Sequence, residues 1–296
     1  MQDALEALIG SLLPVEEGPG LYLGEPVETG WGRIYGGQLI AQAAAAACST
    51  VREDRALRSL HSYFLKPGSL GHPIRYRVET MREGLEISHR RVEASQKGTL
   101  IFHLAASFSS MGGGLVHQDE MPDAPPPGEC GTEAGMIREF LDGLDPRLRR
   151  RLPKGLERRL HEEQPIELRP ISPANFLLPG DGEPRRSMWM RCRGELPEDS
   201  RLHSILLLYA SDFPMVGTAL QPHGTNTLSP LARVASLDHG AWFHAPFRFD
   251  RWTLFQTRSP RAAGGRVLVH GEFWSGDGAL VSTCVQEGMA RVRRQR

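Results

Sequence analysis

Cysteine is scarce in this chain of 296 residues and occurs only at Cys48, Cys130, Cys192 and Cys284. The four positions lie far apart and form no Cys-x-x-Cys or Cys/His cluster, which argues against a structural zinc site. Such sparse, scattered use of cysteine is typical of proteins from a reducing compartment. We therefore expect a cytoplasmic protein without a structural metal.

Long apolar runs and an excess of one charge are also missing. No run approaches the roughly 20 residues that a membrane-spanning helix needs. The N-terminal stretch MQDALEALIGSLLPVEEG has acidic residues and no basic segment, so it predicts a short amphipathic helix rather than a signal peptide. The 35 acidic and 35 basic residues cancel, which argues against general binding to nucleic acid or membrane surfaces. We expect neither as a partner.

The common catalytic signatures are absent as well. The sequence contains no GxSxG elbow, no Walker A loop, no GxGxxG after a predicted strand and no HExxH. Gly36 and Gly37 open a predicted helix, but two glycines alone are a weak signal for phosphate binding. They indicate either close packing or free backbone N–H groups at the start of the helix.

An internal repeat is the strongest positive feature of the chain. LHSYFLKPG (60–68) and LDHGAWFHAP (237–246) share a Leu, a His and an aromatic pair before a Pro, about 180 residues apart. Each is followed by strand-like stretches, the last two of which predict a hairpin with its turn at 96–98 or 276–278. The alignment matches His61 with His239, which we interpret as a structural pair.

A helix-like segment precedes each copy. The first, GGQLIAQAAAAAC (Gly36–Cys48), is rich in alanine and therefore strongly helical. The second is LHSILLLYASDF (Leu202–Phe213). Each copy is thus predicted to be a strand, a long helix and an antiparallel meander, which is an α+β layout with the helix packed on one face of the sheet. We predict a first copy at 1–117, a Pro-rich and helical linker at 118–163, and a second copy at 164–296.

Polar residues distinguish the second copy from the first. Asp212 lies near the C-terminus of its predicted helix, where its charge faces the negative end of the helix dipole at a cost of roughly 0.3–1 kcal/mol. Ser236 precedes Leu-Asp-His, and Gln286 ends an apolar strand at the position that Ala106 holds in the first copy. From the pattern alone, the three polar residues are either ordinary surface groups or are held there for chemistry.

Several short motifs carry a family resemblance. In chain order they are GGQLIAQA, LHSYFLKPG, the hairpin ending AASF, LLLYASDF, ALQPHG, SLDHGAWFHAPF and STCVQEG. Together they resemble the acyl-CoA thioesterase II family, from about Gly20 to about Arg291. The resemblance implies a tandem, or double, hotdog fold, in which each sheet wraps round one long helix. It also implies hydrolysis of acyl-CoA of medium to long chain, by a homo-oligomer such as a tetramer.

The resemblance further implies a catalytic set. Members of this family hold a water molecule with an Asp, a Ser or Thr, and a Gln, which correspond to Asp212 in LLLYASD, Ser236 in ASLDH and Gln286 in VQEG. Asp212 would act as the general base, which contributes about 10²–10⁴-fold. Ser236 and Gln286 would orient the water. No acyl-enzyme, metal or cofactor is implied.

Groups that would contact the rest of the substrate are predicted less sharply. The backbone N–H groups of Gly36 and Gly37 are candidate donors to the oxyanion. Five arginines are candidates for the CoA phosphates, each equally interpretable as surface charge: Arg90, Arg91, Arg258, Arg261 and Arg266. The segment REGLEISHRRV departs from the family pattern at 85–87.

Two other functions stay open at this stage. A hotdog enoyl-CoA hydratase would require a His–Asp pair converging on the substrate and a GD-x-NP-x-H signature, which is absent. A non-catalytic acyl-CoA-binding hotdog protein would bind its ligand with or without Asp212. The complete Asp, Ser and Gln set favours the hydrolase.

Overall fold

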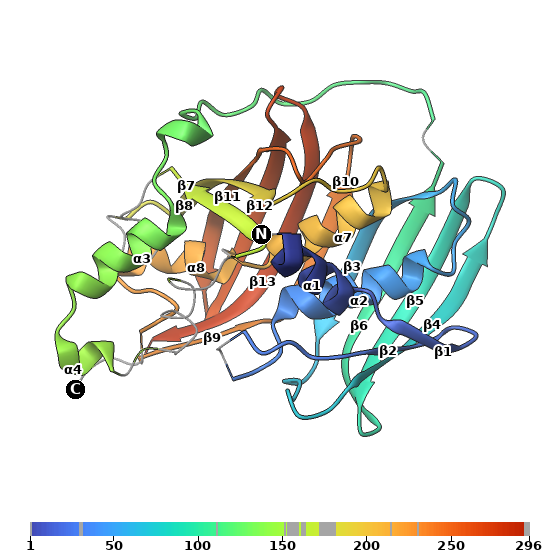
Figure 1. The fold of residues 1–296 in the computed structure, drawn as a ribbon, viewed down its shortest axis with the longest axis horizontal. Helices are drawn as coiled ribbons and strands as arrows, with labels where there is room; N and C mark the ends of the chain where they lie inside the picture. The colour runs from blue at the N-terminus through green and yellow to red at the C-terminus, as the bar shows by residue number, and fades with distance from the viewer. Residues whose placement is uncertain are drawn as a thin grey trace.

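One 13-stranded antiparallel sheet organises the chain (Figure 1). The computed structural model describes residues 2–29, 32–110, 112–150, 152, 160, 164–171, 182–213, 215–229 and 231–292. The strand order is β1-β2-β4-β5-β6-β3-β10-β13-β12-β11-β8-β7, and β9 pairs with β13 beside this path. The strands are β1 (Val15–Gly18), β2 (Leu21–Gly24), β3 (Ala56–Phe64), β4 (Ile74–Glu83), β5 (Ile87–Gln96), β6 (Thr99–Ser109), β7 (Ile166–Pro170), β8 (Arg185–Cys192), β9 (Ala232–Ser236), β10 (Asp238–Phe243), β11 (Thr253–Ala263), β12 (Arg266–Ser275) and β13 (Leu280–Val292).

The strand order confirms the predicted repeat. One half of the sheet runs β2-β4-β5-β6-β3, and the other runs β8-β11-β12-β13-β10. The two halves meet where β3 pairs antiparallel with β10, between the blue to green strands and the orange to red strands of Figure 1. The predicted hairpin turns lie between β5 and β6 and between β12 and β13. This is the predicted double hotdog architecture.

The predicted match of His61 with His239 is wrong. Across β3 and β10, Ser62 faces His239 and His61 faces Gly240. Because neighbouring residues of a strand point to opposite faces of a sheet, His61 is exposed on the outer face whereas only 1% of His239 is exposed. Two residues separate His239 from the aromatic pair of its copy, but one residue separates His61 from the other pair. The two histidines therefore cannot share a register.

The aromatic pairs give the correct alignment, in which Leu60 corresponds to His239. Leu60 faces Ala106 on the neighbouring strand, and His239 contacts Gln286 on its neighbouring strand. Leu60 is fully buried, as is appropriate for an apolar pair on the inner face. The second half therefore has two polar residues where the first half has two apolar ones.

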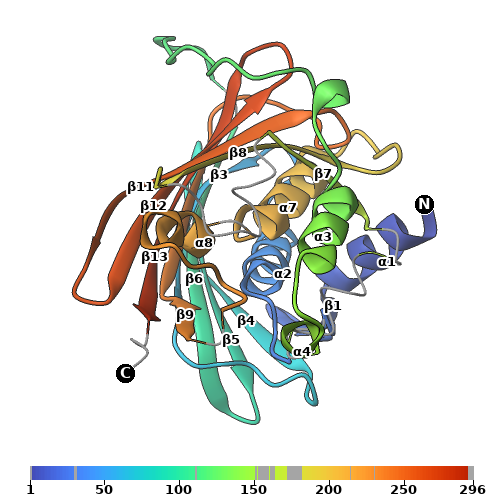
Figure 2. The same ribbon diagram turned by 90° about the vertical axis from the view of Figure 1, so that its left-hand side faces the viewer.

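Two long helices lie side by side on the inner face of the sheet, α2 (Gly36–Cys48) and α7 (Ser200–Ser211). Figure 2 shows them with α1 (Gln2–Leu12) and α3 (Glu133–Asp142) on their other side. The predicted bounds of α2 are confirmed, and its residues are buried from Gly37 onward. α7 includes most of the predicted helix-like segment, and Asp199 caps it by accepting from the backbone N–H of Arg201.

The linker folds onto the second half. Gln118 exchanges hydrogen bonds with the backbone of Gly278 and Leu280, and the indole of Trp189 donates to Pro125 O at 2.8 Å. The described part of this segment contains α3, α4 (Pro146–Arg149) and the short 3-10 helix η1 (Pro127–Glu129). Residues 151, 153–159 and 161–163 of the predicted linker lie outside the described residues. The boundaries at 117/118 and 163/164 stay a prediction.

The remaining described helices, α8 (Met215–Leu220) and the 3-10 helix η2 (Gln221–His223), follow α7 and pack beside the second half of the sheet. Over the part of the chain that the structure describes, we find no helix with the length and apolarity needed to cross a bilayer.

Arg201 joins the N-terminus of α7 to the C-terminus of α2. Its guanidinium donates to four backbone carbonyls: those of Cys48 (3.0 Å), Val51 (3.1 Å), Arg52 and Arg55 (3.2 Å). A helix leaves its last carbonyls without intrahelical partners, and the cation also suits the negative end of the α2 dipole. The contacts show that α2 and α7 run antiparallel, with the α2 C-terminus beside the start of α7.

We expect Arg201→Met to lower the free energy of unfolding by about 1–3 kcal/mol, because four carbonyls, most of them in partly buried contacts, lose their donor. Urea unfolding monitored by circular dichroism measures this change. The matched control is Arg52→Met, which removes an exposed arginine paired with Asp54 and should stay within about 0.5 kcal/mol of wild type. Equal effects of the two substitutions would contradict the proposed stabilising role of the Arg201 guanidinium.

Candidate active site

The ends of two helices meet at Asp212. Asp212 is the C-cap residue of α7, and its Oδ2 accepts from the backbone N–H of Gly37 in the first turn of α2 at 3.1 Å. The N-terminus of a helix carries a partial positive charge that stabilises a neighbouring anion. The unfavourable end of α7 is therefore compensated by the favourable end of α2, which explains how a carboxylate is held at this position.

The glycine pair makes this approach possible. A Cβ on Gly36 would lie 2.6 Å from Asp212 Oδ2 and 3.1 Å from the Phe64 ring. A Cβ on Gly37 would clash with the carbonyl oxygen of Tyr209 and lie 2.6 Å from the ring of Tyr35. Both predicted interpretations of the pair therefore hold, because the glycines allow close packing and one of them presents its N–H.

The structure brings Asp212, Ser236 and Gln286 together, although they come from α7, β9 and β13. The Ser236 hydroxyl donates to Asp212 Oδ1 at 3.2 Å. The Gln286 amide donates through Nε2 to Ser236 Oγ at 2.9 Å. Pairing of β9 with β13, in which Ser236 faces Gly288, sets the hydroxyl close to the amide. Gln286 is buried, while Asp212 and Ser236 are half-buried at the open end of the series.

His239 is a member of this group that sequence reasoning missed. Its Nδ1 lies 2.7 Å from Gln286 Oε1, and its Nε2 lies 3.1 Å from the hydroxyl of Ser211. Burial lowers the pKa of His239, although Asp212, Gln286 and Asp238 act in the opposite direction. The signal that could have found His239 is the alignment on the aromatic pairs, which sets this polar residue against Leu60.

Cys284 also lies close to the group but is not equipped as a nucleophile. Burial is the main cause that raises the pKa of its thiol, and the charges of Asp212 and Glu272 raise it further. The thiol is therefore neutral, and the thiolate is the reactive form of cysteine. Among the described residues there is also no group of three His, Cys, Asp or Glu side chains that could hold a metal ion.

The predicted oxyanion donors need one correction. The Gly37 N–H donates to Asp212 in this structure, so we no longer assign it to a substrate oxygen. Gly36, as the first residue of α2, belongs to the turn whose N–H groups have no intrahelical partner. The assignment of its N–H to the oxyanion stays a prediction.

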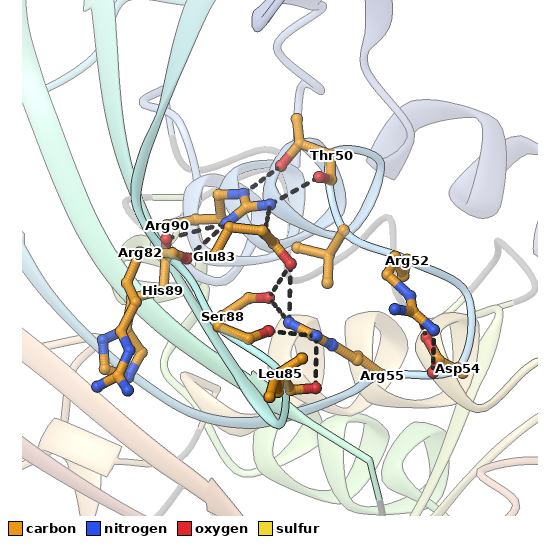
Figure 3. Close-up of polar contacts among 12 residues, drawn as sticks. Thr50, Arg52, Asp54, Arg55, Arg82, Glu83, Leu85, Ser88, His89 and Arg90 are labelled. Atoms are coloured by element: carbon orange, nitrogen blue, oxygen red, sulfur yellow. Dashed lines mark hydrogen bonds and ion pairs between the residues drawn. The ribbon is translucent and has the colours of Figure 1, made fainter.

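The predicted role of Arg90 at CoA phosphates does not fit its surroundings. Arg90 is 3% exposed and donates to Glu83 Oε2 at 2.6 Å, to Thr50 Oγ1 and O, and to two further carbonyls. Figure 3 shows it between Thr50 and Glu83, next to a second buried arginine, Arg55. Arg90 is thus already saturated with acceptors. The failure has a physical cause, since sequence cannot distinguish a buried, fully paired arginine from a free one.

The other arginine candidates are exposed. Arg91 pairs with Glu79 and Glu93, and Arg266 pairs with Glu287. Arg258 and Arg261 lie exposed on β11. Their assignment to CoA phosphates stays a prediction.

The arginine network of Figure 3 occupies the place in the first half that the polar group occupies in the second. Arg90 faces Ala106 across β5 and β6, as Val269 faces Gln286 across β12 and β13. Arg55 donates to Glu83, to Ser88, and to the carbonyls of the 84–85 turn. At the C-terminal end of α2, the first half therefore has an arginine network in place of a counterpart to the Asp212, Ser236 and Gln286 group.

Comparison with known proteins adds to this geometry. The family profile described as acyl-CoA thioesterase matches residues 159–289, and the profile described as acyl-CoA thioesterase N-terminal domain matches residues 26–109. The chain is 42% identical over 265 residues to acyl-coenzyme A thioesterase 8 of Homo sapiens, an alignment that covers 89% of this chain and 82% of the human protein.

Solved structures agree. The chain is similar to an acyl-CoA thioesterase II from Mycobacterium marinum, with 33% identity and a TM-score of 0.76 over 96% of this chain and 98% of the other. It is also similar to a hot dog fold protein of unknown function from Alicyclobacillus acidocaldarius, with 19% identity and a TM-score of 0.75 over 97% and 99% of the two chains. At this lower identity the second likeness supports the fold alone.

Proposed function

This chain belongs to the acyl-CoA thioesterase family, and from that premise we propose that it hydrolyses medium- to long-chain acyl-CoA with a water held by Asp212, Ser236 and Gln286. The products are a free fatty acid and CoA. The observation that carries the proposal is the series of hydrogen bonds from Gln286 to Ser236 and from Ser236 to Asp212. A polar series that ends on a half-buried carboxylate can position a water and accept its proton.

The reaction follows from these roles. Asp212 accepts a proton from the water as the water oxygen forms a bond to the thioester carbonyl carbon, and the carbonyl oxygen becomes an oxyanion. Collapse of this intermediate breaks the C–S bond and expels the CoA thiolate, which takes up the proton that Asp212 removed from the water and so regenerates the carboxylate. The N–H of Gly36 is our candidate donor to the oxyanion. A thioester is an activated acyl group, so a positioned water replaces a protein nucleophile.

Release of free thiol from a panel of acyl-CoAs, from short to long chain, tests the activity. We expect turnover that is highest with medium to long chains. Bound acyl-CoA without turnover at any length would favour the non-catalytic binding protein. Addition of water to an enoyl-CoA without thiol release would favour the hydratase.

The same family membership supports two expectations about the protein in the cell. We propose that it forms a homo-oligomer such as a tetramer, which analytical ultracentrifugation measures. We propose the cytoplasm as its compartment, because the four cysteines are free and buried and need no oxidising environment. Imaging of the tagged full-length chain tests the location.

A further inference from the structure

The orientation of the Gln286 amide follows from its neighbours. The Asp212 carboxylate can only accept, so the Ser236 hydroxyl at 3.2 Å must donate to it. The Ser236 oxygen then accepts from Gln286, which requires the Nε2 end of the amide. The Oε1 end consequently faces His239 Nδ1 at 2.7 Å. An amide oxygen has no hydrogen to give, so Nδ1 must be the protonated nitrogen.

The Nε2 side of the imidazole also has a hydrogen-bonding neighbour. Its Nε2 lies 3.1 Å from Ser211 Oγ, whose hydroxyl donates to Leu208 O at 2.8 Å in this structure. The low pKa that burial gives His239 favours the neutral ring. With Nδ1 protonated, a neutral ring has its lone pair on Nε2, so in that form the single Ser211 hydroxyl hydrogen is directed to Nε2 instead of to Leu208 O. The charged groups that act on the ring are Asp212 and Asp238.

Resting on the function proposed above, we propose that His239 is a positioning residue that fixes the Gln286 amide, and through it the Ser236 hydroxyl, in the orientation that hydrolysis requires. From His239 onward, every donor in the resulting series points toward Asp212: His239 to Gln286, Gln286 to Ser236, and Ser236 to the carboxylate. A reversed amide would present its oxygen to Ser236 and compete with Asp212 for the hydroxyl proton. His239 disfavours that reversal, because the reversed amide would set its N–H against Nδ1–H, and two donors cannot form a hydrogen bond with each other.

Packing alone does not explain a histidine at this position. The corresponding residue of the first half is Leu60, which faces Ala106 and is fully buried. A leucine therefore packs well at the corresponding strand position on the inner face of the sheet. The imidazole and the amide occur together in the half that contains Asp212, as a shared role in orientation requires.

The test compares two substitutions of His239. His239→Leu copies the first half and removes the donor, and we expect it to lower kcat by about 10–100-fold with KM within about two-fold. His239→Asn retains an N–H at the position of Nδ1, and we expect kcat within about five-fold of wild type. Equal losses in the two variants, with both folded by circular dichroism, would overturn the proposal, as would wild-type kcat in His239→Leu.

A double-mutant cycle adds a result that a purely structural role would not produce. If His239 acts through the amide, His239→Leu should change kcat by less than about three-fold in a Gln286→Leu background. Multiplicative losses would show that His239 acts independently of Gln286 and would overturn the proposal.

Imidazole nitrogen NMR separates failure of this inference from failure of the proposed function. The His239 signals, assigned by their loss in His239→Asn, should report a neutral ring protonated at Nδ1 at pH 7. The Nε2-protonated form would overturn the inference whether or not the protein is active. The expected tautomer in a protein that hydrolyses no acyl-CoA would support the geometry while refuting the proposed function.

Discussion

Asp212→Asn should lower kcat for acyl-CoA hydrolysis by at least about 10²-fold while the protein stays folded. An asparagine has nearly the same shape as aspartate, and its oxygen can still accept from the Gly37 N–H. Its amide cannot remove a proton from water, and with its oxygen at the Gly37 N–H it presents an NH2 donor, not an acceptor, to the Ser236 hydroxyl. The loss should therefore appear in kcat, with little change in KM, when free thiol is measured under saturating acyl-CoA.

The matched control for this experiment is Asp54→Asn, which neutralises an exposed aspartate paired with Arg52. We expect wild-type kcat from it. If Asp212→Asn retained the turnover of this control, another group would have to be the base, although the enzyme would remain a thioesterase.

The second large effect is expected from Gly37→Ala. The added methyl group would meet the Tyr209 carbonyl and the Tyr35 ring, so α2 would have to move away from α7 and withdraw its N–H from Asp212. We expect kcat to fall at least about 10-fold. Overpacking of this kind also lowers the free energy of unfolding by about 1–3 kcal/mol. Thiol release and urea unfolding measure the two effects.

Gly10→Ala is the control for the glycine experiment. Gly10 lies inside α1, and a Cβ there meets no atom within 4 Å. Alanine favours a helix interior by roughly 0.5–1 kcal/mol relative to glycine, so this variant should be slightly more stable and fully active. If Gly37→Ala behaved like Gly10→Ala, close approach of the two helices would not be needed for activity.

Local sequence patterns predicted the elements of this fold well. The alanine run of α2 gave the right bounds because alanine favours helix and its methyl side chains let the sheet wrap closely. The turn signals at 96–98 and 276–278 lie between β5 and β6 and between β12 and β13, as predicted. Asp212 stood out for a physical reason, since a carboxylate at a helix C-terminus requires compensation. These signals act over a few residues and are therefore visible in sequence.

What the sequence did not predict depends on contacts between distant segments. The Gly37 N–H reaches Asp212 across 175 residues of chain. His239 was misaligned with His61 because a shift of one residue moves a side chain to the opposite face of a strand. Arg90 was a phosphate candidate because burial against Thr50 and Glu83 cannot be seen in the chain order. The roles of Asp212, Ser236 and Gln286 rested on the family resemblance, not on pattern.

The arginine network in the first half has a consequence for stoichiometry. With that place filled, the described residues contain one candidate catalytic centre for the two hotdog units, so we expect a tight-binding inhibitor to titrate one equivalent per chain. The centre itself is shared, since one unit supplies the helix N-terminus at Gly37 and the other supplies Asp212. Each chain is in effect a heterodimer whose subunits are covalently joined.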